Sequence, residues 1–414
     1  MALTIKKDSL SPLHEKEFQF FIVARFLYVM SLRMVATVLA YKLFQLTQTS
    51  LAIGLVGLAE FVPVFSLALY AGHVIDKSDK RTLLVKGMLS YSLCVVSLVV
   101  VTSSFLEKQM STKMLELCFY GIIFLTGIIR AFVGPTTNAI VSQLVPRNIL
   151  QFAANISSST FLIASIMGHA SAGFFIAWFG VNTTFCIILF YILLASFMIA
   201  KIARKPIVHT KKDIVAWESM KEGLRYVFTN KILLGAISLD LFAVLFGGAV
   251  ALIPEFASKV LAVGPIGFGW LNAATDMGSM TIIILLTLFP MRKKQGQRMM
   301  YAVAGFGLCI IIFGLSSFYA ISFAALLISG TCDGISVMVR GTIFQLTTPD
   351  EMRGRVSSVN SMFINSSNEL GMMESGITSR IMGLRPSLIF GGSITLLVVI
   401  ITWLKAPKLR KMEY

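Results

Sequence analysis

The chain has 414 residues, of which 56% are hydrophobic and 14% are charged, and its formal net charge is +16. Soluble domains contain about 45–50% apolar and about 25% charged residues, so this composition excludes a soluble globular protein and indicates a polytopic membrane protein. The basic residues lie in loops beside apolar segments, which membrane topology explains better than nucleic-acid binding does.

Motifs for enzymatic or ATP-driven chemistry are absent from the sequence. There is no GxxxxGK[ST] phosphate loop, no GxSxG elbow and no HExxH pattern, so we expect neither ATP-driven transport nor an enzyme. The five cysteines lie inside apolar runs without CxxC or Cys/His spacing, which is typical of packing residues. We therefore expect no disulfide framework, no metal site and no cofactor.

Apolar runs of membrane length define the elements in chain order and predict an all-α membrane protein. The polar segment 1–17 lacks a signal-peptide pattern, so we expect the first span to be retained. A helix needs about 20 apolar residues to cross the hydrocarbon core of a bilayer. This criterion predicts twelve spans, at 18–44, 50–75, 82–105, 115–141, 149–178, 181–203, 230–257, 265–290, 298–315, 318–346, 355–381 and 386–405.

Lys and Arg predict the orientation of these spans. Most of those in the loops fall on the side of the N-terminus, so the positive-inside rule places both termini in the cytoplasm. The opposite side carries only Lys108, Lys113, Lys259, Arg380 and Arg385.

A long polar stretch, residues 201–231, divides the spans six and six. It predicts an N-terminal bundle over 1–203, a cytoplasmic linker over 204–229 and a C-terminal bundle over 230–414. Apolar and charged residues alternate in the linker at helical spacing, so we expect an amphipathic helix on the cytoplasmic leaflet. The apolar face would consist of Trp217, Met220, Leu224, Val227 and Phe228, opposite Glu218, Lys221, Glu222 and Arg225.

The two halves of the chain resemble each other at an offset of 203 residues. Four glycines and prolines match in spans four to five and ten to eleven, which predicts a parallel repeat of two six-helix bundles. The matched pairs are Gly127 with Gly330, Pro146 with Pro349, Gly168 with Gly371 and Gly173 with Gly376, while Arg130 matches Asp333.

Two motifs resemble those of the major facilitator superfamily, and the resemblance covers the whole chain. The run Gly72-x-x-x-Asp76-Lys77-x-x-Lys80-Arg81 is similar to the family's loop two-three signature, with Asp79 where a glycine is usual, and Arg130-x-x-x-Gly134 resembles its second motif. Further matches resemble the bacterial branch that includes the enterobactin exporter and macrolide-type efflux proteins. They are Glu222 to Val227, Leu239 to Leu241, Asp333 to Arg340, Gln345, Pro349, Asp350, Met352 to Val356, Glu369 to Gly371 and Gly376.

The charged turn between spans two and three is expected to act in gating. Gly72 allows close approach of another helix, and Asp76 is suited to accept hydrogen bonds from amides at a helix N-terminus. The start of span eleven, Arg353, Gly354 and Arg355, is the expected partner. The alternative is that Lys77, Lys80 and Arg81 only anchor the topology.

Charged residues inside the spans are the candidates for coupling, because each costs about 2.5–3.5 kcal/mol at the bilayer centre by insertion scales. Proton coupling needs a carboxylate that burial makes easier to protonate. Four carboxylates are candidates, in the order Asp333, Glu60, Glu369 and Glu374.

In the family that the chain resembles, spans one, four, seven and ten line the substrate cavity. This implies a place near the cavity for Arg33, Arg130, Asp240 and Asp333. Asp333 and Arg340 are two helical turns apart, so an ion pair along one helix is one interpretation, and a purely structural salt bridge is the alternative for each charge. Aromatic contacts to the substrate are expected from Tyr28, Phe65, Phe242, Phe246 and Trp270, and bending points from Pro63, Pro135 and Pro254.

The sequence therefore predicts a proton-coupled secondary transporter that exports an amphipathic organic molecule, a siderophore or a drug, by alternating access. The export direction follows from the resemblance alone. We expect a monomer in the bacterial cytoplasmic (inner) membrane, with a small-molecule substrate, protons and the lipid bilayer as partners. The alternatives are a lipid or lysolipid flippase and a non-transporting membrane sensor on the same scaffold.

Overall fold

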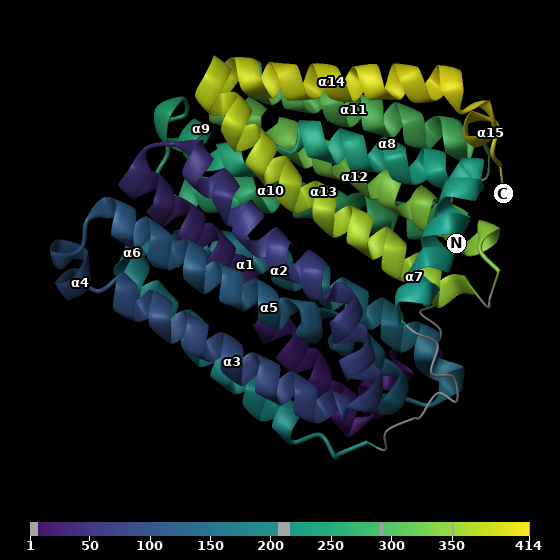
Figure 1. The fold of residues 1–414 in the computed structure, drawn as a ribbon, viewed down its shortest axis with the longest axis horizontal. Coiled ribbons are helices and arrows are strands. Elements are labelled where there is room, and N and C mark those ends of the chain that lie inside the picture. The colour runs from purple at the N-terminus through teal and green to yellow at the C-terminus, as the bar shows by residue number, and fades with distance from the viewer. Residues whose placement is uncertain (1–6, 206–215, 290, 292, 350–351, 414) are drawn as a thin grey trace. The chain divides into compact units, whose positions relative to one another are not determined.

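The computed structural model describes residues 7–205, 216–289, 291, 293–349 and 352–413, and all regular elements of this part of the chain are helices (Figure 1). Residues 206–215 of the expected linker lie outside it. The elements are η1 (Lys7–His14), α1 (Lys16–Thr47), α2 (Ser50–Lys77), α3 (Lys80–Val101), α4 (Ser104–Gln109), α5 (Thr112–Leu144), η2 (Arg147–Ile149), α6 (Leu150–Ala200), α7 (Ala216–Thr229), α8 (Lys231–Gly247), η3 (Val250–Leu252), α9 (Ile253–Lys259), α10 (Pro265–Leu288), α11 (Gln295–Leu315), α12 (Tyr319–Thr347), α13 (Arg353–Met382), α14 (Leu384–Lys405) and α15 (Pro407–Arg410).

The chain forms two compact units. Unit 1 consists of Met1–Val38 and Val62–Asp213, and unit 2 consists of Leu39–Phe61 and Ile214–Tyr414. Residues 39–61, which include the end of α1 and the start of α2, therefore pack as part of unit 2.

Ten helical segments of the described residues are long and apolar enough to cross a membrane. The segment Arg147–Ala200 covers two predicted spans, because α6 comprises two helices that meet at Gly180, whose φ of 76° and ψ of 173° are not helical and suit glycine. Helix α13 covers the predicted span 355–381 but is rich in Ser and Asn, so it is not one of the ten. The exact number of twelve spans stays a prediction.

Polar residues at the helix starts explain several boundaries. Asp79 caps α3 by accepting from the Thr82 amide at 3.1 Å, and Asn230 caps α8 by accepting from the Ile232 and Leu233 amides. The span predicted over 230–257 is broken between α8 and α9 around Gly248. Pro254 therefore lies in the first turn of α9, where the backbone N–H that proline lacks would have no acceptor within the helix. The expected kink in a continuous span is thus not present at Pro254.

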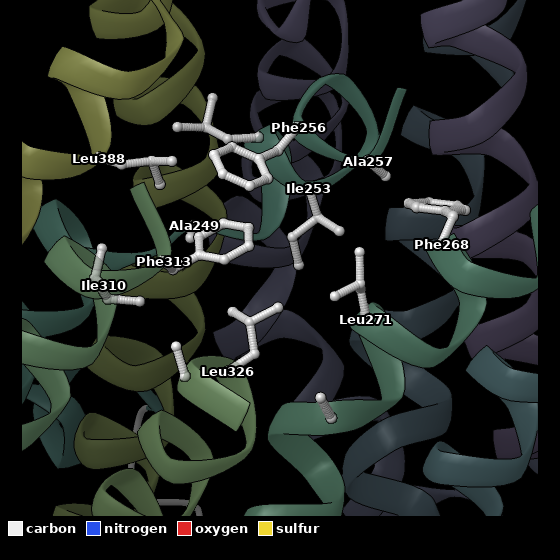
Figure 2. Packing of buried hydrophobic residues seen from close by; sticks show 13 residues of the cluster. Ala249, Ile253, Phe256, Ala257, Phe268, Leu271, Ile310, Phe313, Leu326 and Leu388 are labelled. Carbon is white, nitrogen blue, oxygen red and sulfur yellow. The ribbon is translucent and has the colours of Figure 1, made fainter. Parts of the chain in front are cut away.

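A hydrophobic cluster of unit 2 surrounds α9 (Figure 2). The rings of Phe256 and Phe313 lie 4.3 Å apart between their centroids, and Ile253 and Leu326 are also buried in this cluster. Burial of such side chains stabilises a fold by about 1.5–3 kcal/mol each in water, and in a bilayer the gain comes mainly from close packing. The broken segment α8–α9 is thereby fixed against α10, α11 and α12.

Glycines at equivalent places in the two halves make equivalent contacts. A Cβ at Gly168 of α6 would lie 2.6 Å from the Met30 carbonyl oxygen of α1, and one at Gly371 of α13 would lie 2.9 Å from the Val244 carbonyl oxygen of α8. Each glycine thus lets the fifth predicted span of its half cross the first span closely. This pair is one of those that predicted the repeat.

The amphipathic linker helix is present as α7, and part of its apolar face packs on protein. Val227 is fully buried against Val356 and Val359 of α13, and the Tyr226 hydroxyl donates to the carbonyl oxygen of Thr347. Val227 of the predicted apolar face is thus used in packing against α13, whereas Phe228 is 55% exposed, and the placement of this helix on the leaflet stays a prediction. The side chains of Trp217 and Met220 lie outside the described residues.

Candidate functional site

A buried ion pair joins α8 to α12 inside unit 2. The carboxylate of Asp240 binds the guanidinium of Arg340, and the two side chains are 8% and 6% exposed. Asp240 and Asp333 both line a small cavity between α8, α11 and α12, together with Val303, Phe306 and Ser336 among others. The cavity of about 10 Å³ has space for about one water molecule.

The pairing of Arg340 differs from the one considered from the sequence. Two helical turns separate Arg340 from Asp333 on α12, whereas Asp240 approaches Arg340 directly from the neighbouring helix. Arg340 pairs with a residue of another helix because two turns of α12 separate it from Asp333 by about 10 Å along the axis, which is longer than an ion-pair contact. Asp333 therefore lines the cavity beside an Asp240–Arg340 pair in which it takes no part.

Asp276 of α10 is a further charged residue near Asp333, and the two carboxyl groups interact electrostatically. The crossing of α10 and α12 explains this proximity, since a Cβ at Gly330 would collide with the Thr275 carbonyl oxygen and Ser279 Oγ donates to the Gly330 carbonyl oxygen at 2.9 Å. The sequence showed Asp276 inside a span but gave no signal for this neighbour. Gly330 in span ten, which the repeat singled out, was the sequence feature that indicated a close helix crossing there.

The other predicted coupling carboxylates lie at a different place in unit 2. Glu60 is on α2, and Glu369 and Glu374 are on α13; all three are half-buried. A Cβ at Gly57 would lie 2.6 Å from the Glu369 carbonyl oxygen, so α2 and α13 cross closely beside these acids. They are not residues of the Asp240–Asp333 cavity.

The predicted cavity residues of unit 1 fall into two places. The Arg33 guanidinium lies 5.5 Å from the centre of the Phe161 ring of α6, which is a cation–π contact. Tyr28 is buried, packs edge-on against Tyr91 of α3 with 5.8 Å between ring centroids, and interacts electrostatically with Arg130 of α5. Arg130 itself is exposed.

The aromatic residues expected to contact substrate are scattered. Phe65 of α2 and Phe242 of α8 are 44% and 42% exposed. Phe246 and Trp270 are half-buried, and the Phe246 backbone packs against Gly391 of α14. Within the described residues these four side chains do not line the cavity of unit 2.

The predicted gating turn is only two residues long, because α2 extends to Lys77 and α3 begins at Lys80. The aspartate that accepts from amides at the start of α3 is Asp79, whereas Asp76 lies in the last turn of α2, and its pairing with span eleven stays a prediction. Burial opposes ionisation of Asp79, but hydrogen bonds from the Thr82 hydroxyl and amide hold its pKa below the usual value. Arg81 donates to the carbonyl oxygen of Ala200 at the end of α6.

Two predicted gating glycines are in open surroundings. A Cβ at Gly72 or at Gly354 would meet no atom within 4 Å. The approach of another helix to Gly72 stays a prediction. Arg353, Gly354 and Arg355 form the first turn of α13 as predicted, and Arg355 forms an ion pair with Glu222 of α7. Both halves of this pair belong to unit 2.

A polar cluster that the sequence did not reveal holds residues 39–61 within unit 2. Glu255 of α9 accepts from the Ser50 amide at 3.2 Å and from the Ser50 hydroxyl, and so caps the start of α2. Lys259 lies 2.8 Å from the Glu255 carboxylate and donates to the Gln48 carbonyl oxygen at 3.2 Å. The only sequence signal was an acidic residue inside an apolar run.

The described residues contain no group of three or more His, Cys, Asp or Glu side chains suited to hold a metal ion. Several charges of the described residues are instead paired across helices or directed at helix ends, as Asp240 with Arg340 and Asp79 at the start of α3. Such an arrangement suits binding of small molecules and protons within a helical bundle.

Comparison with known proteins identifies the family. The family model described as a transmembrane secretion effector of the major facilitator superfamily matches residues 7–414. The chain belongs to this family. Macrolide efflux protein A of Streptococcus pyogenes is 21% identical over 87% of this chain and 89% of its own, and the enterobactin exporter of Shigella flexneri is 22% identical over 81% and 78%.

The major facilitator fold is also shown by solved structures. A crystal structure of a D-xylose–proton symporter matches with a TM-score of 0.75 at 12% identity, over 96% of this chain and 99% of that one. The resemblance stated from the loop signature is thus confirmed, as are the two-bundle helical fold and the kinship with macrolide and siderophore exporters. The protein is a multi-pass membrane protein whose family and fold are those of membrane transporters of small molecules.

Proposed function

We propose that this transporter couples inward proton movement to the export of an amphipathic organic molecule, a siderophore or a drug. Alternating access of the two bundles in the bacterial inner membrane, with both termini in the cytoplasm, provides the transport cycle. The export direction is supported by the macrolide and enterobactin exporters among the relatives.

The observation that carries proton coupling is the Asp240–Arg340 ion pair beside the cavity lined by Asp333. Arg340 is engaged by Asp240, and the carboxyl group near Asp333 is that of Asp276, which has the same charge sign. Asp333 lines the cavity while Arg340 is engaged by Asp240, so we assign the coupled proton to Asp333. Glu60, Glu369 and Glu374 are the secondary candidates.

The driving force is sufficient for this coupling. Moving one elementary charge through 100 mV provides about 2.3 kcal/mol. A gradient of about 40-fold in an uncharged substrate corresponds to about the same free energy. One proton per substrate therefore supports useful export.

Reconstituted vesicles test the proposal. Siderophores, macrolides and lysolipids are offered with and without an imposed pH gradient, and we expect gradient-dependent movement of a siderophore or macrolide with accompanying proton flux. Asp333→Asn should abolish proton flux linked to substrate, whereas Glu116→Gln, a change at a carboxylate bonded to Tyr120 outside the cavity, should keep it.

Two results would contradict the proposal. Undiminished coupling in the Asp333→Asn protein would exclude Asp333 as the proton site. Movement of lysolipid alone, independent of the pH gradient, would favour the flippase that the sequence left as an alternative.

A further inference from the structure

Charges inside the membrane are divided unevenly between the two units. The predicted spans of unit 1 contain Arg25, Arg33, Lys86 and Arg130, and their one acid is Glu116 near the start of α5, which accepts from the Tyr120 hydroxyl. The spans of unit 2 contain the acids Asp240, Asp276 and Asp333. A molecule bound by unit 1 thus meets a cationic environment.

Two groups on one face of α1 lack the acceptors that buried donors normally have. Arg25 is half-buried, and its Nη1 donates to the Asn138 side-chain oxygen of α5 at 3.4 Å, while its Nε has no hydrogen-bond partner among the described residues. One turn further, Tyr28 is only 4% exposed and its hydroxyl is also without a partner there. Arg130 of α5 lies close enough to Tyr28 to interact electrostatically.

These groups together define a ligand chemistry. A guanidinium offers only donors in a planar fork, and a tyrosine hydroxyl offers a donor, so the complement is an oxygen that accepts hydrogen bonds. Negative charge on that oxygen matches the two arginines and strengthens each hydrogen bond. An amine or another cation would be repelled and would leave the donors unmatched.

We propose that Arg25, Tyr28 and Arg130 bind an anionic oxygen group, a carboxylate or phenolate, of the exported molecule. The inference rests on the proposed function of export and specifies its substrate class. An amphipathic acid is bound through its anionic end between α1 and α5, and its apolar part meets the Phe- and Met-rich helices. Cationic drugs are disfavoured at this position.

Equilibrium binding to the purified full-length protein in detergent tests the inference. The probes are naphthalene-2-carboxylate and its cationic counterpart naphthalen-2-ylmethylammonium, which have similar size and opposite charge, and isothermal titration calorimetry measures both. We expect the carboxylate to bind at least tenfold more tightly. Naphthyl phosphate, as a third probe, shows whether the site prefers carboxylate over phosphate.

Variants locate the binding. Arg25→Gln should weaken carboxylate binding about tenfold, and Tyr28→Phe should weaken it severalfold while removing a hydroxyl that has no partner in the protein. Arg147→Gln removes an exposed positive charge of unit 1 outside the site and is expected to leave binding unchanged. The cationic probe should respond to none of the three.

Equal affinity for the two charged probes, or carboxylate binding that Tyr28→Phe and Arg25→Gln both leave intact, would overturn the inference. Binding is measured without a pH gradient, so its outcome is independent of whether Asp333 couples protons. Loss of proton flux in the Asp333→Asn protein together with unchanged carboxylate binding would separate the two proposals.

Discussion

Asp79 illustrates how a single residue can have a clear structural role that differs from the one its motif suggests. In the family signature a glycine is usual at this position, and the sequence directed attention to Asp76. The structure shows that Asp79 ends the turn and caps α3 through the Thr82 amide and hydroxyl. Spacing alone could not separate the two acids, because the end of α2 was uncertain by several residues.

Replacing Asp79 by Ala should lower the free energy of unfolding by about 1 kcal/mol, because the N-terminal amides of α3 lose their acceptor. Asp79→Asn keeps an acceptor and should cost less. The folded pKa of Asp79 is depressed, so the ionised contribution is complete above the unfolded value of about 3.9 and is lost as pH falls through the lower folded pKa. Titrations with SDS in mixed micelles at pH 8 and pH 5 should therefore give the same difference between Asp79→Ala and wild type. A difference that disappears by pH 5 would contradict this assignment.

The Asp240–Arg340 pair shows the same limit for the functional site. Both residues were named from the sequence, yet their partnership joins positions 100 residues apart that only the packing of α8 on α12 brings together. Periodicity along one helix reveals faces, but not which face of another helix meets them. Candidate charges are therefore easier to predict than their partners.

Removing one member of this pair leaves a buried, uncompensated charge. We expect Asp240→Leu and Arg340→Leu each to cost about 3–5 kcal/mol, and the double variant to cost clearly less than the two together. SDS titration of the four proteins provides the double-mutant cycle. Additive losses would mean that the two groups do not interact.

At the scale of elements, glycines determine where helices approach closely. Gly330 of α12 faces the Thr275 backbone of α10, whereas a Cβ at Gly121 of α5 would meet no atom within 4 Å. The composition showed that glycines are frequent, but not which ones lie at crossings. Only the offset of 203 residues singled out Gly330, Gly168 and Gly371 beforehand.

Gly330 and Gly121 provide a matched test of close helix packing. Gly330→Ala should destabilise the protein by about 1–3 kcal/mol, since the methyl group collides with backbone that cannot move away. Gly121→Ala should be neutral or stabilise by up to about 1 kcal/mol, because alanine favours the helix and nothing obstructs it. Both are read by SDS unfolding, and equal effects of the two changes would refute the close crossing.

The cluster around Glu255 determines how the start of α2 is held. Glu255→Ala removes the acceptor of the Ser50 amide, so hydrogen exchange in the first turn of α2 should accelerate about tenfold or more. Lys259→Met removes only the ion pair and the contact with the Gln48 carbonyl, and its effect should be smaller. Mass spectrometry of peptides covering residues 39–61 makes the measurement. Unchanged exchange in Glu255→Ala would show that the cap does not hold this segment.

At the scale of the whole molecule, composition and apolar runs were sufficient to predict a helical membrane protein, and the motif resemblance predicted a transporter; the family and fold comparisons confirm both. The polar character of α13 and the packing of α7 on protein were harder to predict, because both depend on contacts with neighbouring helices rather than with lipid. Val227 looks like a membrane-facing residue in sequence and is buried by α13 in the structure. Hydropathy indicates that a side chain is removed from water, but it does not distinguish burial in lipid from burial against protein.

Asp76 offers a test in which function and stability separate. It is exposed in the last turn of α2, where the negative end of the helix dipole disfavours a carboxylate, and alanine is the better helix former. Asp76→Ala should therefore insert normally and unfold at the same or slightly higher SDS concentration. If Asp76 gates the cycle, transport in vesicles should fall at least tenfold in the same protein.

Glu15→Ala, which removes another exposed acid of unit 1, is the control and should keep transport. Near-normal transport by Asp76→Ala would leave Lys77, Lys80 and Arg81 as topology anchors, the alternative that the sequence allowed.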